Sequence, residues 1–460
     1  MSLTVTVLVP AHDEAATIGR CINAIRTGSY PVERIVVVAD ACTDNTAELA
    51  RLAGADLVLE TDFKDKAAAQ NAALWDITSD VVVGFDGDTW PDPDCIRLMV
   101  EHIERDGLDA TCSTILPAQG DVVPYSEGTR RWEAAFFTRQ RRFAYALGRR
   151  WWRLCQAKVG RIQVLTGACY AFKTSAIHGI GGFPNGLITA DMDATWALHG
   201  AGYKLDYTGD ALAYTLDPED FKTYRNQMRR WSSGYYQNMA KHRGQLKNWR
   251  SFLVVGGAIF DLVSLFFTEG YLIWSAATGT NEALLKAFLF WTAIHTVVSS
   301  VLVATVVGVR EAVLGIVPYT LVNYYNKWLY LCGFTREWIL GRHYASWTGR
   351  QGRKTVITPM TQARRRVLGT LGALTGTAVS ILGGYLGNTT LWAAGLTAAV
   401  VIPPSMLRLR GTGQRRAPRA AEAAPVPAVD QLAAVEETVP LAKLLDPDTE
   451  TTLQIALPAR

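Results

Sequence analysis

The chain has 460 residues, of which 49% are apolar and only 19% are charged, and its formal net charge is +4. A balance this close to neutral argues against nucleic acid as a partner, while the apolar excess favours contact with lipid. The seven cysteines are odd in number and include no Cys-x-x-Cys pair, so neither a disulfide framework nor a zinc site is expected. Reduced thiols facing the cytoplasm are the simplest interpretation, and the first residues show no secretory signal.

The first part of the sequence alternates short apolar runs with segments of helical spacing. Strands are predicted at residues 5–9, 35–39, 57–59 and 81–85, and helices at 15–26, 43–53 and 66–75. Continuous valine-rich strands joined by helices are typical of a parallel sheet that is buried on both faces. The sequence therefore predicts an α/β domain whose ligands bind at the carboxyl ends of the strands.

Residues 126–161 interleave arginine with tryptophan, phenylalanine and tyrosine. This composition predicts amphipathic helices that lie in the interface of a membrane, because arginine and tryptophan both favour that layer. A solvated helix packed on the α/β domain is the alternative that the pattern leaves open.

Beyond residue 250 the chain becomes strongly apolar. Four membrane spans are predicted, at residues 252–277, 284–308, 368–386 and 391–407. The stretch 313–334 has a polar centre, so a re-entrant or interfacial segment is expected there, which keeps the basic loop 335–366 on the cytoplasmic side. The tail of residues 411–460, rich in Ala, Pro and Glu, is predicted to be disordered.

Two carboxylates at a spacing of two follow the last predicted strand, in Phe85-Asp86-Gly87-Asp88-Thr89. Because the strand ends in a turn at Gly87, both side chains are expected to reach one divalent cation. Mg²⁺ or Mn²⁺ bridges phosphates and supplies the Lewis acid that a departing nucleoside diphosphate needs. A turn with capping carboxylates is the alternative.

Polar residues also close the first two strands. Asp40 ends the second strand and is expected to accept hydrogen bonds from the base or ribose of a nucleotide, with a helix cap as the alternative. Pro10 and Glu14 belong to the segment that closes the first strand and are expected to line the same nucleotide pocket. Capping of the following helix stays open for that segment.

Two later motifs suit the acceptor side of a transfer reaction. Asp191, in Thr-Ala-Asp-Met-Asp, is predicted to take the proton from an attacking hydroxyl, with a helix cap as the alternative. Gln227, Arg230 and Trp231 share one face of a predicted helix. Arg230 is expected to stabilise a leaving diphosphate and Trp231 to stack on a sugar ring. The alternative is an amphipathic helix that leads into the membrane.

Taken in order, these segments resemble the family 2 glycosyltransferases, and among them the processive membrane synthases of chitin-, hyaluronan-, cellulose- or poly-N-acetylglucosamine-like polymers. The resemblance covers about residues 4–235. It rests on VLVPAHDE at 7–14, VADACTDNT at 38–46, DKAAAQNAAL at 65–74, FDGDT at 85–89, TGACYAFKTSAI with IGGF at 166–183, TADMD at 189–193 and QMRRW at 227–231.

The resemblance implies a GT-A fold with a Rossmann-like sheet, and an inverting displacement without a covalent intermediate. It implies a UDP-sugar or related nucleotide-sugar donor, a glycan, lipid or protein acceptor, and a lipid bilayer as partner. The implied site residues have these roles: Asp40 contacts uracil or ribose, Lys66 contacts donor phosphate, Asp86 contacts the nucleotide and the metal, Asp88 binds the metal, Asp191 is the base, and Gln227, Arg230 and Trp231 hold the diphosphate and the acceptor.

The same resemblance divides the chain into four parts. Residues 1–125 form the half that binds the nucleotide-sugar, 126–250 the acceptor half, 251–410 the transmembrane region and 411–460 the tail. The expected location is the plasma membrane, with several spans and a cytoplasmic catalytic domain.

The sequence departs from the family pattern in two motifs. Asp65 precedes Lys66 where a glycine is usual, and Ala190 precedes Asp191 where a glutamate is usual. No predicted span precedes the catalytic domain. Two other functions therefore stay open: a single transfer to a lipid or protein acceptor, and a catalytically silent membrane scaffold or transport component.

Overall fold

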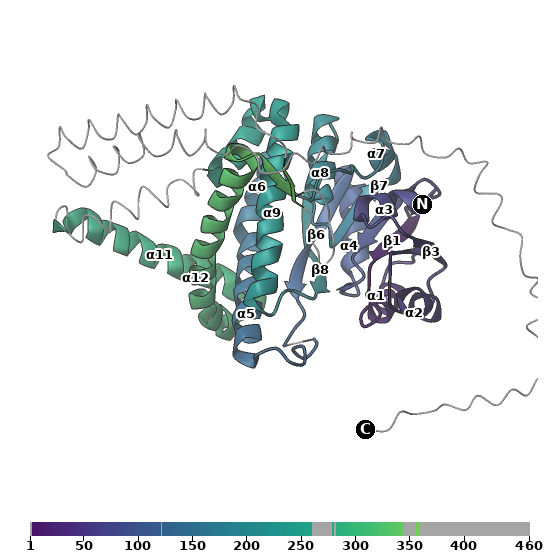
Figure 1. The fold of residues 1–460 in the computed structure, drawn as a ribbon, viewed down its shortest axis with the longest axis horizontal. Helices are drawn as coiled ribbons and strands as arrows, with labels where there is room; N and C mark the ends of the chain where they lie inside the picture. The colour runs from purple at the N-terminus through teal and green to yellow at the C-terminus, as the bar shows by residue number, and fades with distance from the viewer. Residues whose placement is uncertain (1, 121, 260–277, 280–281, 345–354, 358–460) are drawn as a thin grey trace, which may run out of the picture. The chain divides into compact units, whose positions relative to one another are not determined.

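A computed structural model of the protein describes residues 2–120, 122–259, 278–279, 282–344 and 355–357 (Figure 1). The chain divides into two compact units, Met1–Gln362 and Ala363–Arg460, and the second lies outside the described residues. The spans predicted at 368–386 and 391–407, the predicted tail and most of the span predicted at 252–277 lie outside them too.

An eight-stranded mixed sheet forms the core of the first unit, in the order β3-β2-β1-β4-β7-β6-β8-β5 (Figure 1). Its strands are β1 (Val5–Ala11), β2 (Arg34–Asp40), β3 (Leu57–Thr61), β4 (Val81–Phe85), β5 (Thr89–Pro91), β6 (Ala110–Pro117), β7 (Cys169–Lys173) and β8 (Leu205–Thr215). β1 pairs in parallel with β2 and β4, and β2 with β3, whereas β7 runs antiparallel to β4 and β6. The parallel sheet predicted from the valine runs is confirmed for β1 to β4, and a partly antiparallel half extends it.

Helices cover both faces of this sheet. They are α1 (Ile18–Arg26), α2 (Thr46–Leu52), α3 (Lys66–Leu74), α4 (Cys95–Asp106), α7 (Thr174–Gly179) and α8 (Ala190–Gly200). Neighbouring residues of β1 belong to two separate cores, because side chains alternate across a strand. Val7 and Val9 pack with Ile22 of α1, and Leu8 packs in the other core with Leu74 of α3. The sheet is therefore buried on both faces, as its continuous apolar strands predict.

Four long helices pack beside the sheet domain, together with shorter elements. The long helices are α5 (Arg131–Leu147), α9 (Phe221–Lys241), α11 (Glu282–Val307) and α12 (Val309–Phe334). The shorter ones are the π-helices η1 (Gly148–Trp152) and η3 (Thr335–Ile339), α6 (Arg153–Val159), the 3₁₀-helix η2 (Arg243–Lys247) and the paired strands β9 (Arg342–Tyr344) and β10 (Thr355–Ile357). Phe137 of α5 stacks on Tyr224 of α9 with 4.9 Å between ring centroids, and Phe143 stacks on Tyr319 of α12 at 4.6 Å. Aromatic contacts thus join α5 to both α9 and α12.

The structure sharpens the predictions for the basic aromatic segment. Residues 126–161 contribute α5, η1 and α6, and Arg141 and Arg142 in the middle of α5 are only 3% and 6% exposed. The middle of α5 is therefore packed inside the unit and is not solvated, which differs from the alternative left open for this segment. Its placement in a membrane interface stays a prediction.

The apolar segments after residue 280 form continuous helices. The stretch 313–334 lies within α12, which continues past Pro318, so no re-entrant loop forms there. An interfacial position for this stretch stays a prediction. Within the described residues, no helix combines the length and the apolar character that crossing a membrane requires. The span predicted at 284–308, which forms most of α11, is therefore not confirmed.

Candidate active site

A large cavity opens at the carboxyl ends of the parallel strands, with a volume of about 2670 Å³. This exceeds the roughly 300–1,000 Å³ of a typical small-ligand pocket, so it has room for two substrates. Every residue predicted for the site lines it: Pro10, Glu14, Asp40, Lys66, Asp86, Asp88, Asp191, Gln227, Arg230 and Trp231. The predicted nucleotide side and the predicted acceptor side therefore face the same space.

Asp40 lies at the end of β2, is 4% exposed, and uses both carboxylate oxygens. Its Oδ1 accepts hydrogen bonds from the backbone N–H of Phe63 (2.7 Å) and the hydroxyl of Thr61 (2.9 Å), and its Oδ2 accepts one from Asp65 N–H (3.0 Å). Asp40 thus anchors the loop that leads from β3 to Lys66. It does not cap α2, whose N-cap is Asn45, so the capping alternative is wrong.

The loops after β1, β2 and β3 each hold a non-glycine residue in the left-handed region of backbone space. These residues are Asp13 (φ 54°), Ala41 (φ 53°) and Lys64 (φ 56°), and all three line the cavity. Such conformations cost about 1–3 kcal/mol each and concentrate at ligand sites. This edge of the sheet is therefore shaped by local strain, which suits a binding pocket.

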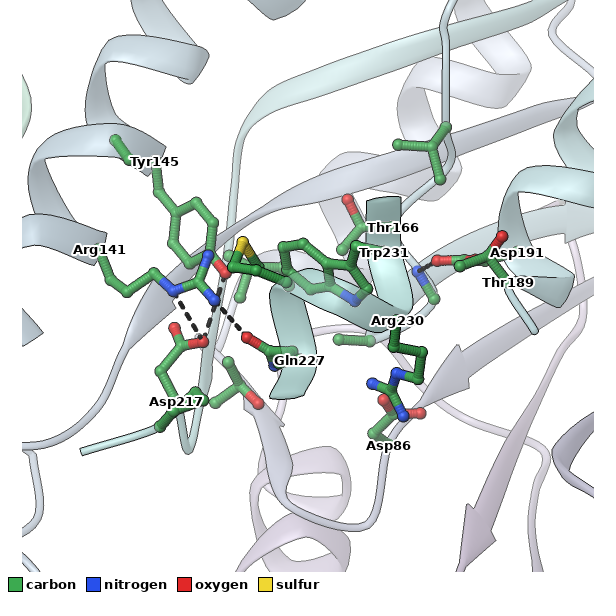
Figure 2. Close-up of a pocket in the computed structure, with 18 of the residues that line it drawn as sticks. Asp86, Arg141, Tyr145, Thr166, Thr189, Asp191, Asp217, Gln227, Arg230 and Trp231 are labelled. Atoms are coloured by element: carbon green, nitrogen blue, oxygen red, sulfur yellow. Dashed lines mark hydrogen bonds and ion pairs between the residues drawn. The ribbon is translucent and has the colours of Figure 1, made fainter. Parts of the chain in front are cut away.

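The side chain of Lys66, at the start of α3, contacts Asp86 at the end of β4. The Lys66 ammonium donates to Asp86 Oδ1 and to the Gly167 carbonyl at 3.2 Å. The Arg230 guanidinium lies beside Asp86 as well (Figure 2). Burial lowers the pKa of Arg230, while the charges of Asp191 and Asp86 oppose that shift. Two cations therefore lie beside one carboxylate, an arrangement that suits the phosphates of a nucleotide.

Asp88 lies on the turn that follows β4, beside β5. Its Oδ1 accepts hydrogen bonds from the hydroxyls of Thr89 (3.3 Å) and Thr215 (3.4 Å). A Cβ at Gly87 would approach Glu14 Cγ to 3.2 Å, so the glycine lets the loop after β1 pack on this turn. Asp86 and Asp88 thus present carboxylate oxygens to the cavity, and such oxygens are the ligands that Mg²⁺ and Mn²⁺ prefer.

Another group of possible metal ligands lies nearby, made of Asp13, Cys42 and Asp44. Both carboxylates in this group accept hydrogen bonds from backbone N–H groups. Asp13 Oδ1 accepts a hydrogen bond from Thr43 N–H at 2.6 Å, and Asp44 Oδ1 accepts one from Thr46 N–H at 3.0 Å. These bonds account for the cluster without an ion.

Asp191 lies in the first turn of α8. Its Oδ2 accepts a hydrogen bond from Gly167 N–H at 3.2 Å, and its Oδ1 accepts one from Met192 N–H at 2.8 Å. A Cβ at Gly167 would lie 3.0 Å from Asp191 Oδ2, so any larger residue there would crowd the Asp191 carboxylate. The N-cap of α8 is Thr189, so Asp191 is not the helix cap and the capping alternative is wrong.

The motif on α9 has the predicted orientation, because Gln227, Arg230 and Trp231 all face the cavity. Figure 2 shows the Trp231 indole between Arg230 and Asp191 on one side and Arg141 on the other. Met228, from the same motif, is 3% exposed and packs in the helix bundle with Phe137 and Tyr224, and it also lines part of the cavity. The motif thus joins the wall of the cavity to the packed helices.

Sequence reasoning missed an ion pair between Arg141 and Asp217. Arg141 Nε lies 3.5 Å from Asp217 Oδ1, and Arg141 also donates to Gln227 Oε1. Burial raises the pKa of Asp217, which the charge of Arg141 opposes. Asp217 stands in an acidic stretch before α9, where it resembles a helix cap, although Asp220 fills that role. Only the fold shows that Asp217 is buried in the cavity wall.

Comparison with protein families matches this architecture. Residues 81–327 match the family described as "Glycosyl transferase family group 2", and residues 6–155 match "Glycosyl transferase family 2". The first match covers more than half of the chain, so the chain belongs to the family 2 glycosyltransferases. Its α/β domain is accordingly of the Rossmann-like GT-A class.

Curated relatives include the poly-beta-1,6-N-acetyl-D-glucosamine synthases of Staphylococcus aureus and Staphylococcus epidermidis. The S. aureus protein is 25% identical over 237 residues, covering 51% of this chain and 55% of the relative. The S. epidermidis protein is 25% identical over 241 residues, with the same shares. The match therefore spans about half the length of these relatives.

Solved structures with a similar fold include a mannosyltransferase from Pyrobaculum calidifontis in complex with GDP-Man and Mn²⁺. It has a TM-score of 0.48 and 21% identity, covering 70% of this chain and 88% of that one. TarS of S. aureus, in complex with UDP-GlcNAc, has a TM-score of 0.34 and 15% identity, with 54% and 73% covered.

Proposed function

We propose that this enzyme transfers a sugar from a nucleotide-sugar, with a UDP-sugar as the first expectation, to a growing glycan with inversion at the anomeric carbon. The observation that carries the proposal is the convergence of the predicted donor and acceptor residues on one cavity. The similarity to staphylococcal poly-beta-1,6-N-acetyl-D-glucosamine synthases supports a glycan product and makes N-acetylglucosamine the first sugar to test.

In the proposed reaction, Asp191 accepts the proton of the attacking hydroxyl. The hydroxyl oxygen forms a bond to the anomeric carbon as the bond from that carbon to the nucleoside diphosphate breaks. Two backbone N–H groups already hold the carboxylate in position, and an aspartate is in general a weak base. A weak base suffices when the proton moves late, after the leaving group has begun to depart.

Lys66 and Arg230 would neutralise the departing diphosphate. Both lie beside Asp86, so incoming phosphate oxygens would meet two cationic donors. Asp86 and Asp88 would hold the divalent cation, and that ion, when bound, supplies further Lewis-acid neutralisation of the diphosphate. Trp231 would present its ring to a sugar on the acceptor side.

We also propose that the enzyme works against the cytoplasmic face of a plasma membrane. A stripe of apolar side chains at about one-turn spacing is exposed along α12: Val309, Val313, Val317, Leu321 and Trp328. Exposed apolar stripes of this length favour contact with lipid or another apolar surface.

A donor screen tests the proposed function. The purified full chain is incubated with UDP- and GDP-sugars, with Mn²⁺ or with a chelator, and released nucleotide and product size are measured. We expect metal-dependent release with one UDP-sugar and a ladder of products. A single sugar per acceptor would favour the single-transfer alternative, and no release with any donor would favour the silent scaffold.

A further inference from the structure

The cavity continues beyond Trp231 into a buried polar recess, which we call the Arg141 recess and define by Gln140, Arg141, Asp217 and Asn226. All four residues line the cavity. Arg141 joins its three walls, because it extends from α5, pairs with Asp217 after β8 and donates to Gln227 of α9 (Figure 2). The recess lies on the side of Trp231 that faces away from Asp191 and Arg230.

The recess carries enclosed acceptor oxygens that lack donors. Among the described residues, none donates a hydrogen bond to Gln140 Oε1, Asp217 Oδ2 or Asn226 Oδ1, and solvent barely reaches these atoms. Gln140 is 2% exposed and Asp217 is 7% exposed. An enclosed polar atom without a partner costs about 1–3 kcal/mol, so these oxygens favour a ligand that donates several hydrogen bonds.

Aromatic rings surround the same recess. The Arg141 guanidinium lies 4.7 Å from the ring centroid of Tyr224, 5.0 Å from that of Trp231 and 5.5 Å from that of Tyr145. Rings beside hydrogen-bond acceptors suit a ligand with an apolar face and a rim of hydroxyl groups. A sugar ring has both features, whereas a lipid chain offers no hydroxyl donors.

We propose that the Arg141 recess is a second saccharide subsite, which holds the penultimate sugar ring of the acceptor while Trp231 faces the terminal ring. The inference rests on the proposed function and narrows its acceptor to a glycan of at least two sugars. The enclosed oxygens of Gln140, Asp217 and Asn226 accept hydrogen bonds from the hydroxyl groups of that ring. Arg141 fixes the recess by pairing with Asp217.

Acceptor length provides the test. The full chain is supplied with UDP-N-acetylglucosamine and with N-acetylglucosamine or its β-1,6-linked di- and trisaccharides, and kcat/KM is measured for each acceptor. We expect the disaccharide to exceed the monosaccharide by about tenfold or more, since hydrogen bonds to charged groups are worth about 1.5–3 kcal/mol. Asp217→Asn should remove most of that preference, so that kcat/KM falls by a larger factor for the disaccharide than for the monosaccharide.

A second variant, Asn226→Ala, leaves the buried ion pair intact and should also reduce the preference for the disaccharide. It keeps the test available if Asp217→Asn does not fold. The matched control is Asp210→Asn, because Asp210 pairs with Arg149 at 2.6 Å between η1 and β8 but is 82% exposed. The control should keep the full preference.

The subsite is overturned if the wild type has the same kcat/KM for the monosaccharide and the disaccharide. It is also overturned if the variants lose kcat/KM by the same factor for both acceptors. UDP release without transfer to any of the three acceptors also overturns the subsite, but it does not contradict the assignment of the donor-binding residues. No nucleotide release with any donor contradicts the proposed function itself.

Discussion

Asp40 and Asp191 illustrate how single residues in this chain combine structural and chemical roles. Asp40 holds the loop before Lys66 through three hydrogen bonds, so its carboxylate shapes the donor pocket before any nucleotide arrives. Asp191 is held by two backbone N–H groups at the other side of the cavity. Both carboxylates are thus fixed in place, which spares the reaction the cost of ordering them.

His199 gives a residue-scale prediction about pH. It lies in α8, its Nε2 contacts the Ile162 carbonyl at 2.9 Å, and burial lowers its pKa from 6.5 to about 4. The unfolded chain protonates this histidine below pH 6.5, whereas the folded chain resists protonation until about pH 4. The contribution of neutral His199 to the free energy of unfolding is therefore fully present above pH 6.5 and is lost as the pH falls toward 4. The loss amounts to about 3 kcal/mol, because one pKa unit corresponds to about 1.4 kcal/mol.

Denaturant unfolding of the full chain at several pH values measures this effect. The His199→Gln variant keeps an N–H donor for the Ile162 carbonyl and should show a clearly shallower loss of unfolding free energy between pH 6.5 and 4. A variant with the slope of the wild type would show that His199 is not the group responsible.

At the scale of elements, α5 links the sheet domain to the long helices. Phe143 is 1% exposed, stacks on Tyr319, and shares a core with Val303 of α11 and Ala312 of α12. Gly315 brings the two backbones together, because a Cβ there would lie 3.2 Å from the Arg139 carbonyl oxygen. The arginines of α5 suggested a surface helix, but its packing partners lie about 170 residues further along the chain, beyond the reach of local pattern.

Phe143→Ala should lower the free energy of unfolding by about 3–5 kcal/mol, because the neighbouring helices cannot close a cavity of phenyl size. Trp132→Ala serves as the control on the same helix, since Trp132 is 67% exposed and should change stability by about 0.5 kcal/mol or less. A loss for Phe143→Ala no larger than that of the control would contradict the packing described here. Chemical denaturation of both variants gives the comparison.

For the whole molecule, the sequence predicted the first half of the fold better than the second. Valine runs predicted β1 to β4 because a strand buried on both faces has a local signature. β5 to β8 are shorter or more polar and pair across long separations, as β6 does with β8, so their order has no local signal. Asp40 and Asp86 were predicted because they follow strand ends, and Asp191 and Arg230 because they belong to recognisable motifs. Asp217 was missed because its place in the cavity depends on a buried pairing with α5.

Membrane contact is a property of the whole molecule, and the α12 stripe makes it testable. We expect the full chain to float with vesicles of phosphatidylglycerol and phosphatidylcholine, and Val313→Ser with Val317→Ser to reduce the bound fraction by about half or more. Leu52→Ser on α2 is the control, because Leu52 is 77% exposed and lies in the sheet domain. Equal flotation of the double variant and the control would argue against lipid contact through α12.

The most direct test of the central claim is the rate of sugar transfer by Asp191→Asn. Asparagine keeps the shape of the side chain but cannot accept the proton, so we expect transfer to fall by about 10²–10⁴-fold while the affinity for UDP changes by less than about twofold. Single-turnover transfer and UDP titration on the same preparation give both numbers. Transfer by the variant at the rate of the wild type would contradict the assignment of Asp191 as the base and the mechanism built on it.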